Sequence, residues 1–265
     1  MELSSVTISI LVLSGILVGL LNTYAGAAAA LTFAIFSALG MPITAINGTN
    51  RIPIIFQTLT MSVGFKKQGV LNVNHGLKLG VPTIIGASIG AYYAAIIPPS
   101  IFEILLGAIL LLLLGVLLYD PKKFLKPRIM NHKMPRKIDY IWFLLIGLYG
   151  GMFHVGVGYF VLTVAILSMG YNLVEASAIK GFIVLLYAPV TLLIFMSHDQ
   201  IWYTYGILHG LGNVIGAGTA TYFAKKIPMN LIRWSLVIMI TITALDLFGL
   251  FDLKTALQNI FKLFI

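Results

Sequence analysis

Long apolar runs, separated by short polar or charged breaks, organise this sequence. No charged residue occurs between Glu2 and Arg51, and another charge-free stretch lies between Asp139 and Glu175. A membrane-spanning helix needs about 20 mostly apolar residues. Breaks at proline, glycine and charge predict ten apolar segments, at 5–21, 26–39, 44–65, 74–96, 101–119, 139–152, 156–169, 174–196, 201–224 and 229–251. We therefore predict an all-α polytopic membrane protein.

The composition agrees with this pattern and excludes a soluble fold. Of 265 residues, 59% are hydrophobic and only 9% are charged, whereas soluble domains carry about 25% charged residues. The chain has no cysteine, so disulfides and thiolate metal sites are excluded. A signal peptide has a basic region before its apolar run. No lysine or arginine precedes the first apolar segment, and we expect that segment to be retained as a helix.

The net charge of +9 comes from bases that gather in three loops. These bases are Lys66, Lys67, Lys78, Lys122, Lys123, Lys126, Arg128, Lys133, Arg136, Lys137, Lys225, Lys226 and Arg233. An excess of lysine and arginine marks cytoplasmic loops. We expect all three loops on the cytoplasmic side and both termini on the non-cytoplasmic side. Nucleic-acid binding by the basic linker is the less favoured interpretation, and no nucleic-acid partner is expected.

The two halves of the chain resemble each other at a shift of about 130 residues. Matching pairs include Gly26 and Gly156, Gly40 and Gly170, Gly76 and Gly206, Gly80 and Gly210, and segments 85–92 and 215–222. An odd number of crossings per half makes the repeats inverted, as in many secondary transporters. We predict a first repeat at 1–119, a basic cytoplasmic linker at 120–138 and a second repeat at 139–265. Each repeat would hold a short interrupted helix pair plus three spanning helices.

Polar or glycine-rich sequence interrupts the first two segments of each half, which are short, about 14–17 residues. The breaks lie at 22–26 and 150–158. Interrupted segments at matching positions point to a transporter binding site, and free amides at a helix start attract anions. Alternatively, the glycines only permit close helix packing. Whether the short segments are re-entrant hairpins or full tilted spans stays open.

Five short motifs are spread along the chain. They are Asn22-Thr23-Tyr24-Ala25-Gly26, Leu39-Gly40-Met41-Pro42, Asn47-Gly48-Thr49-Asn50-Arg51, Gly156-Val157-Gly158-Tyr159-Phe160 and Ala176-Ser177-Ala178-Ile179-Lys180. Together they resemble the TauE/SafE-type sulfite and organosulfonate exporter family, over about residues 14–251. The resemblance implies export or uptake of small, often sulfur-containing oxyanions across the bacterial cytoplasmic (inner) membrane. The sequence departs from the family pattern at two places. Ala27–Ala30 replace the usual glycine run, and His154 replaces a small residue. Either departure could mark a different substrate or coupling ion.

Arg51 and Lys180 are the leading candidates for substrate binding. Each opens a long apolar segment just after the interrupted pair of its half, and Lys180 matches Asn50 in the repeat register. Inverted symmetry would bring both cations toward one central cavity, and cations within membranes are functional by default. The alternatives are that both snorkel to the interface, or that Lys180 pairs with Glu175.

Eight further polar residues lie at the breaks or near these cations. We expect substrate hydrogen bonds from Asn22, Thr23, Thr49 and Asn50, and lining of the cavity by Asn47, Gln57 and Tyr187. Helix capping is an equal alternative for Asn22, Thr23, Thr49 and Asn50, and packing between helices is the alternative for Tyr187. His154 is a candidate carrier of a coupling proton, because histidine titrates near neutral pH. A packed, neutral His154 is the alternative.

The motifs favour a transporter over an enzyme. The sequence has no P-loop, no HExxH motif and no histidine pair at i,i+4, so neither a metal nor another cofactor is expected. We predict a secondary transporter of small sulfur-containing oxyanions that works by alternating access in the lipid bilayer. Its energy would come from a coupling proton or cation, from a partner, or from the gradient of the substrate itself. An anion channel on the same scaffold and a transporter of other small carboxylates are the alternatives. Homo-oligomer formation stays open.

Overall fold

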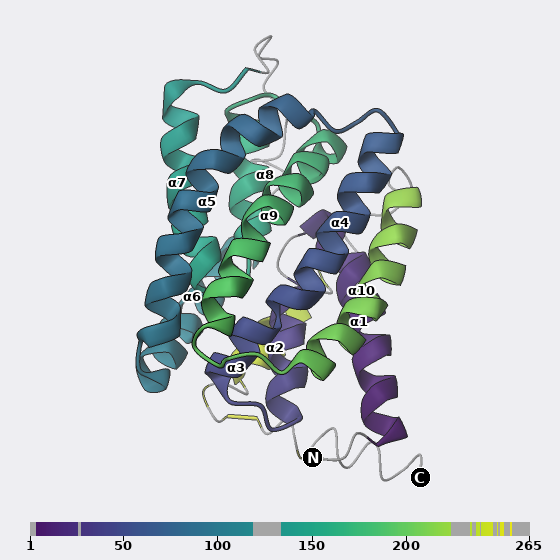
Figure 1. Cartoon of the computed structure of the whole chain (residues 1–265), viewed down its shortest axis with the longest axis vertical. Coiled ribbons are helices and arrows are strands. Elements are labelled where there is room, and N and C mark those ends of the chain that lie inside the picture. The colour runs from purple at the N-terminus through teal and green to yellow at the C-terminus, as the bar shows by residue number, and fades with distance from the viewer. Residues whose placement is uncertain are drawn as a thin grey trace.

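The computed structural model of the chain is a bundle of helices (Figure 1). It describes residues 4–25, 28–118 and 134–223, and beyond these residues 234, 237–238, 240–245, 248, 250–251 and 255. This described part contains ten helices and no strand. Three helices are long and apolar enough to cross a membrane, at Ser5–Tyr24, Val73–Ile96 and Leu173–Met196. The prediction of an all-α polytopic membrane protein is confirmed.

Most helices coincide with predicted apolar segments. They are α1 (Ser5–Ala25), α2 (Ala29–Ala38), α3 (Ile43–Thr49), α4 (Arg51–Lys67), α5 (Val73–Ile96), α6 (Pro99–Leu118), α7 (Lys137–Met152), α8 (Val157–Leu167), α9 (Leu173–Met196) and α10 (Tyr203–Tyr222). About half of the predicted segment at 229–251 and most of the predicted linker at 120–138 lie outside the described residues.

The predicted segment 44–65 is two helices rather than one, which corrects the sequence prediction. α3 ends at Thr49 and α4 begins at Arg51. Pro53, in the first turn of α4, has no amide hydrogen, and in a continuous helix its ring would collide with the carbonyl group of Thr49. The break therefore falls just before this proline.

The first segment is longer than predicted, which is a second correction. α1 has 21 residues and remains helical through Asn22 and Thr23 to Ala25. The interruption of the first half therefore follows Ala25 instead of beginning at Asn22. The helices that follow the two breaks, α2 and α8, are short, with 10 and 11 residues.

Polar caps and left-handed glycines set several helix ends. The Asn72 side chain accepts a hydrogen bond from a first-turn amide of α5, and Asn172 and Glu175 form a capping box at the start of α9. Such bonds satisfy amides that lack a partner within the helix. Gly40 and Gly170, which follow α2 and α8, have positive φ angles of 82° and 72°. This conformation suits glycine, which has no Cβ, and it turns the chain toward α3 and α9.

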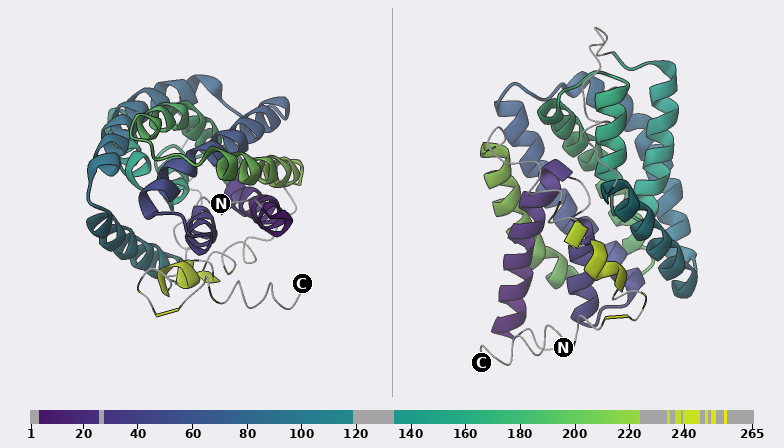
Figure 2. Two further views of the ribbon diagram at one scale, coloured as in Figure 1. Left: turned by 60° about the horizontal axis from the view of Figure 1, so that its bottom comes forward. Right: turned by 180° about the vertical axis from the view of Figure 1, so that it is seen from behind.

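Two parallel helix pairs, α1 with α10 and α5 with α7, run side by side through the bundle (Figures 1 and 2). Glycines lie at both contacts. A Cβ atom at Gly86 would collide with the main-chain oxygen of Leu144, and one at Gly216 with that of Ile16. Small residues allow such close backbone approach between membrane helices. Close packing is therefore the role of these two glycines, which match each other in the predicted repeat register.

Helix starts recur at the predicted shift. α3 and α9 begin 130 residues apart, at Ile43 and Leu173, and so do α5 and α10, at Val73 and Tyr203. The shift that was found from sequence identity therefore also relates helix positions. The inversion of the two halves and the domain boundaries stay predictions.

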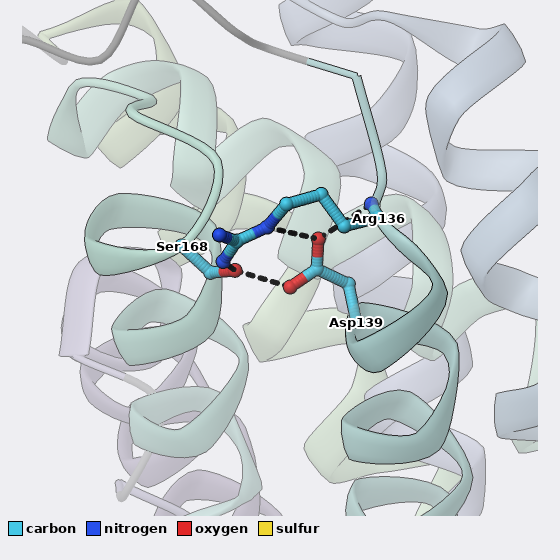
Figure 3. Close-up of polar contacts among 3 residues, drawn as sticks. All are labelled: Arg136, Asp139 and Ser168. Atoms are coloured by element: carbon cyan, nitrogen blue, oxygen red, sulfur yellow. Dashed lines mark hydrogen bonds and ion pairs between the residues drawn. The ribbon is translucent and has the colours of Figure 1, made fainter.

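A polar cluster joins the start of α7 to the end of α8 (Figure 3). The carboxylate of Asp139, which is fully buried, accepts hydrogen bonds from the Ser168 hydroxyl and, at 2.7 Å, from the Arg136 amide. The Arg136 guanidinium also donates to Ser168 at 2.5 Å. α7 and α8 thus form a hairpin that returns to the end where it starts. With 11 residues, α8 is about 16 Å long, half the thickness of a bilayer core, and this length favours a re-entrant hairpin.

Candidate functional site

Lys180 meets the end of α1 in the interior of the bundle. Its ammonium group, near the start of α9, donates hydrogen bonds to the main-chain oxygens of Asn22 at 2.7 Å and Thr23 at 2.8 Å. The residue is only 4% exposed. The last four carbonyl groups of a helix have no partner within it. Lys180 therefore serves as a cap for two of these groups in α1.

Arg51 meets the end of α7 in the same manner. Its guanidinium donates to the main-chain oxygens of Gly150 at 2.8 Å and Gly151 at 2.7 Å. The Asn47 side chain accepts a bond from the same guanidinium at 3.1 Å and donates to the Met152 oxygen at 2.9 Å. Three successive carbonyl groups at the end of α7 are thus satisfied by one turn of chain around the α3–α4 break.

The two cations form a crossed pair of helix caps. Arg51, in the first half, caps α7 of the second half, and Lys180, in the second half, caps α1 of the first. A helix carries a partial negative charge at its C-terminus, which favours a cation there. Among the described residues neither cation forms an ion pair with an acid. The Glu175 side chain, one predicted partner of Lys180, instead accepts a bond from the Asn172 amide.

A small cavity lies beside Lys180. Polar residues on its wall are Asn22, Gln57, Thr58, His154 and Lys180, and the rest of the wall is Met61, Val157, Gly158, Gly181 and Val184. Its volume is about 10 Å³, which suffices for about one water molecule. Arg51 does not line this cavity, so Lys180 is the cation that faces it.

The amide of Asn22 connects the cavity wall to the end of α1. Its nitrogen donates to the Gln57 side-chain oxygen at 3.1 Å. Its own side-chain oxygen is buried and has no hydrogen-bond partner. A buried polar atom without a partner costs about 1–3 kcal/mol. This residue therefore has unused hydrogen-bonding capacity at the cavity.

His154 sits at the break between α7 and α8 in a strained conformation. Its φ angle is +61°, a region that costs an L-residue other than glycine about 1–2 kcal/mol. Its Nδ1 atom lies 2.9 Å from the hydroxyl oxygen of Tyr187, and both side chains are buried. Backbone strain of this kind gathers at functional sites. From the sequence, Tyr187 was expected to line the cavity and His154 to carry a proton; the structure brings the two side chains into contact, and of the two only His154 lines the cavity.

Three of the other predicted ligands do not line the cavity. The Thr23 hydroxyl donates to Gly19 of its own helix at 2.7 Å, and the Thr49 hydroxyl accepts from the Trp202 amide at 2.8 Å. Asn50 precedes α4 but makes no side-chain cap hydrogen bond. Its side-chain amide nitrogen is buried and has no hydrogen-bond partner, so capping does not account for it.

Sequence reasoning missed the main-chain oxygens that hold the two cations. It also missed Phe195, whose ring lies 5.1 Å from the Arg51 guanidinium carbon, within the range of a cation–π interaction. The glycine pair 150–151 was the available signal, because glycine leaves its carbonyl groups open to approach. No group of three or more potential metal-ligating residues occurs within the described ranges.

Comparisons with known proteins agree with the motif resemblance. The family profile described as "Sulfite exporter TauE/SafE" matches residues 11–247. A Sinorhizobium protein described as "Probable membrane transporter protein ORF9" is 24% identical over 237 residues, which are 88% of each chain. A Haemophilus influenzae protein described as "Probable membrane transporter protein" is 22% identical over 244 residues, which are 90% of this chain and 93% of the relative. No solved structure gives a significant match. The chain belongs to the TauE/SafE sulfite exporter family of membrane transporters.

Proposed function

We propose that the protein is a secondary transporter of small sulfur-containing oxyanions that works by alternating access. The observation that carries the proposal is the burial of two cations, Arg51 and Lys180, without an ion-pair partner among the described residues. A charge inside a membrane protein is costly and marks a substrate or ion pathway. Carbonyl dipoles offset part of this cost, and a bound anion would offset more.

Lys180 is the proposed direct ligand of the anion. It faces the cavity, and Asn22 and Gln57 stand beside it on the same wall. A lysine ammonium group has three donors, and the main-chain oxygens of Asn22 and Thr23 take two of them. The third donor is therefore available to an oxyanion. The two side-chain amides can donate further bonds and orient it.

Arg51 acts on the same site through α7 in this proposal. Its two terminal nitrogens are held by Gly150, Gly151 and Asn47. Those contacts fix the end of α7, after which His154 and the first turn of α8 reach the cavity wall. A change in the Arg51 contacts would therefore move the part of the wall that faces Lys180. His154 is the proposed carrier of a coupling proton.

Alternating access fits the size of the cavity. About 10 Å³ admits one water molecule but not a sulfur oxyanion with several heavy atoms. Binding therefore requires the cavity to widen, and this requirement is typical of a carrier that opens to one side at a time. A fixed, open filter would suit a channel better.

The proposed orientation follows the basic residues. Lys66 and Lys67 end α4, while Arg136 and Lys137 begin α7, at the end of the bundle opposite the start of α1 (Figure 1). The positive-inside rule assigns this basic end to the cytoplasm. The start of α1 would then face the non-cytoplasmic side.

The substrate class rests on the family, whose name specifies a sulfite exporter. The test is counterflow in proteoliposomes that contain the purified protein. We expect internal unlabelled sulfite or thiosulfate to accelerate entry of ³⁵S-labelled thiosulfate, and taurine and acetate to define the range of substrates. Liposomes with Lys78→Ala, an exposed lysine on α5, serve as the matched control. Voltage-driven current without trans-stimulation would replace the carrier by a channel, and exchange of acetate alone would overturn the substrate class.

A further inference from the structure

A groove runs along the outer surface between α4 and α10, near the end of α4 that carries Lys66 and Lys67. Its volume is about 530 Å³, and its wall includes Leu59, Val63, Lys67, Gly218 and Tyr222. We call it the α4–α10 groove. It is separate from the small cavity at Lys180, with which it shares no lining residue.

Gly218 leaves the groove open. A Cβ atom at this position would meet only the Thr60 methyl group, at 3.7 Å, which is an ordinary contact. Nearby, the Gln68 side chain donates to the Thr221 main-chain oxygen at 3.0 Å and ties the end of α4 to α10. The groove is therefore a fixed hollow between two tied helices.

The floor and rim of the groove are apolar along most of its length. Leu59 is 50% exposed and Val63 is 47% exposed. On a membrane protein such side chains face acyl chains. Tyr222, at the same end as Lys67, is 80% exposed, and tyrosine is enriched where the apolar core meets the headgroups. The groove thus has an apolar stretch that leads to an interfacial end.

The interfacial end carries positive charge, and no ion pair to Lys66 or Lys67 occurs in the part of the chain that the structure describes. Lys66 and Lys67 are both exposed in the last turn of α4. Lys225 and Lys226 follow α10 closely in sequence. Neither α4 nor α10 contains an aspartate or glutamate. Basic pockets between membrane helices on the cytoplasmic side bind anionic lipid headgroups.

We propose that the α4–α10 groove binds one anionic phospholipid. Its phosphodiester would contact Lys67, and an acyl chain would lie along Leu59 and Val63 over Gly218. A zwitterionic lipid of the same chain length would fill the apolar stretch equally well, but its headgroup carries no net charge to complement the lysines. The preference for an anionic headgroup is therefore the property that distinguishes this site from general lipid contact.

The test is native mass spectrometry of the purified, delipidated full-length protein, titrated with phosphatidylglycerol or with phosphatidylcholine of identical acyl chains. We expect one phosphatidylglycerol to bind with higher affinity than phosphatidylcholine. Lys67→Gln should weaken phosphatidylglycerol binding about fivefold, because one lysine near an anionic headgroup contributes about that factor, and should leave phosphatidylcholine binding unchanged. Lys78→Gln, on α5 and outside the groove, is the matched control and should bind as the unaltered protein does.

A second variant tests the groove itself. Gly218→Leu should fill the hollow and reduce binding of both lipids. Equal affinities for the two lipids, or unchanged phosphatidylglycerol binding in both Lys67→Gln and Gly218→Leu, would overturn the proposal. A dimer that Gly218→Leu dissociates, with no lipid bound, would also overturn it, because a second copy of the chain would then occupy the groove. None of these outcomes bears on anion transport, so the two proposals stand or fall separately.

Discussion

The ammonium nitrogen of Lys180 lies 2.7 Å from the main-chain oxygen of Asn22, although 158 residues separate the two along the chain. Arg51 has the corresponding relation to Gly150, 99 residues away. Each buried cation thus lies where the negative end of a helix makes burial less costly. The cations bind carbonyl oxygens rather than carboxylates. A carbonyl oxygen holds a cation less strongly than a carboxylate does, so an arriving anion can bind the cation more easily.

Replacing Lys180 tests the proposed ligand. We expect Lys180→Met, which keeps the length but not the charge, to slow oxyanion uptake about 10- to 100-fold. A hydrogen bond to a charged group contributes about 1.5–3 kcal/mol, which corresponds to this range. Initial rates of ³⁵S-thiosulfate uptake into proteoliposomes measure the effect. Uptake at the normal rate by a folded Lys180→Met protein would remove Lys180 from the site.

Replacing Arg51 tests the cap of α7. Arg51→Ala removes the partner of the Gly150 and Gly151 oxygens, and we expect a loss of about 2–5 kcal/mol of stability because buried acceptors become unsatisfied. The thermal unfolding midpoint in detergent reports this loss. Lys66→Ala, an exposed base on the same helix, should change stability by less than about 0.5 kcal/mol. Equal midpoints for the two variants would show that the cap contributes nothing.

The left-handed backbone at His154 predicts an order of stabilities. Asparagine tolerates a positive φ angle better than most residues, and β-branched residues tolerate it poorly. We expect His154→Asn to lower the free energy of unfolding by less than about 1 kcal/mol and His154→Val to lower it more, as measured by thermal unfolding in detergent. If the valine variant were as stable as the asparagine variant, the conformation of this residue would not limit stability.

The same histidine predicts a pH effect on transport. If His154 carries the coupling proton, His154→Asn should flatten the pH dependence of uptake, because an asparagine side chain does not titrate. His209→Asn is the comparison, because His209 is buried between α1, α2 and α10 and does not line the cavity. A profile unchanged by His154→Asn would make His154 a packing residue.

Alanine substitutions at two glycines distinguish the effect of close helix packing on stability from the effect of helix propensity. Gly86→Ala places a Cβ atom against the Leu144 main-chain oxygen, whereas a Cβ atom at Gly115 meets nothing within 4 Å. We expect Gly86→Ala to lower the unfolding midpoint strongly and Gly115→Ala to raise it slightly, since alanine is favoured over glycine within a helix by up to about 1 kcal/mol. Matching effects at the two positions would contradict the packing of α5 on α7.

Much of the fold could be predicted because membrane helices leave a clear pattern. The charge-free runs located nearly every described helix. Gly86 and Gly216, at which α5 packs on α7 and α10 packs on α1, lie within the segments 85–92 and 215–222 that match at the repeat shift. The break before Arg51 was missed because the polar run at 47–51 was interpreted as a set of ligands within one segment, although this run and Pro53 both mark an interruption. The length of α1 was misjudged because Asn22 and Thr23 read as a break, although both are helical.

The site was predictable at the level of residue type but not of contact. Lys180, Asn22, Gln57 and His154 do meet at one cavity. The partners of Arg51 were not predicted, because main-chain oxygens are present at every position and the glycine pair 150–151 was the only sequence signal for those that are open to approach. The three-dimensional arrangement of the helix ends identifies them. Thr49, which precedes Arg51, was expected to face the substrate but is held by the Trp202 amide.

The crossed caps also determine when, during synthesis, the end of each capped helix can gain its partner. When the ribosome has completed α1, the lysine that will cover its last carbonyl groups lies more than 150 residues ahead. The end of α1 must therefore wait, in contact with water or the insertion machinery, until α9 has entered the bilayer. α7 differs, because Arg51 has already been made when its glycines emerge. When the first half of this protein is synthesised, the cap of α1 is still missing. The final position of the first half in the membrane therefore depends on the second half.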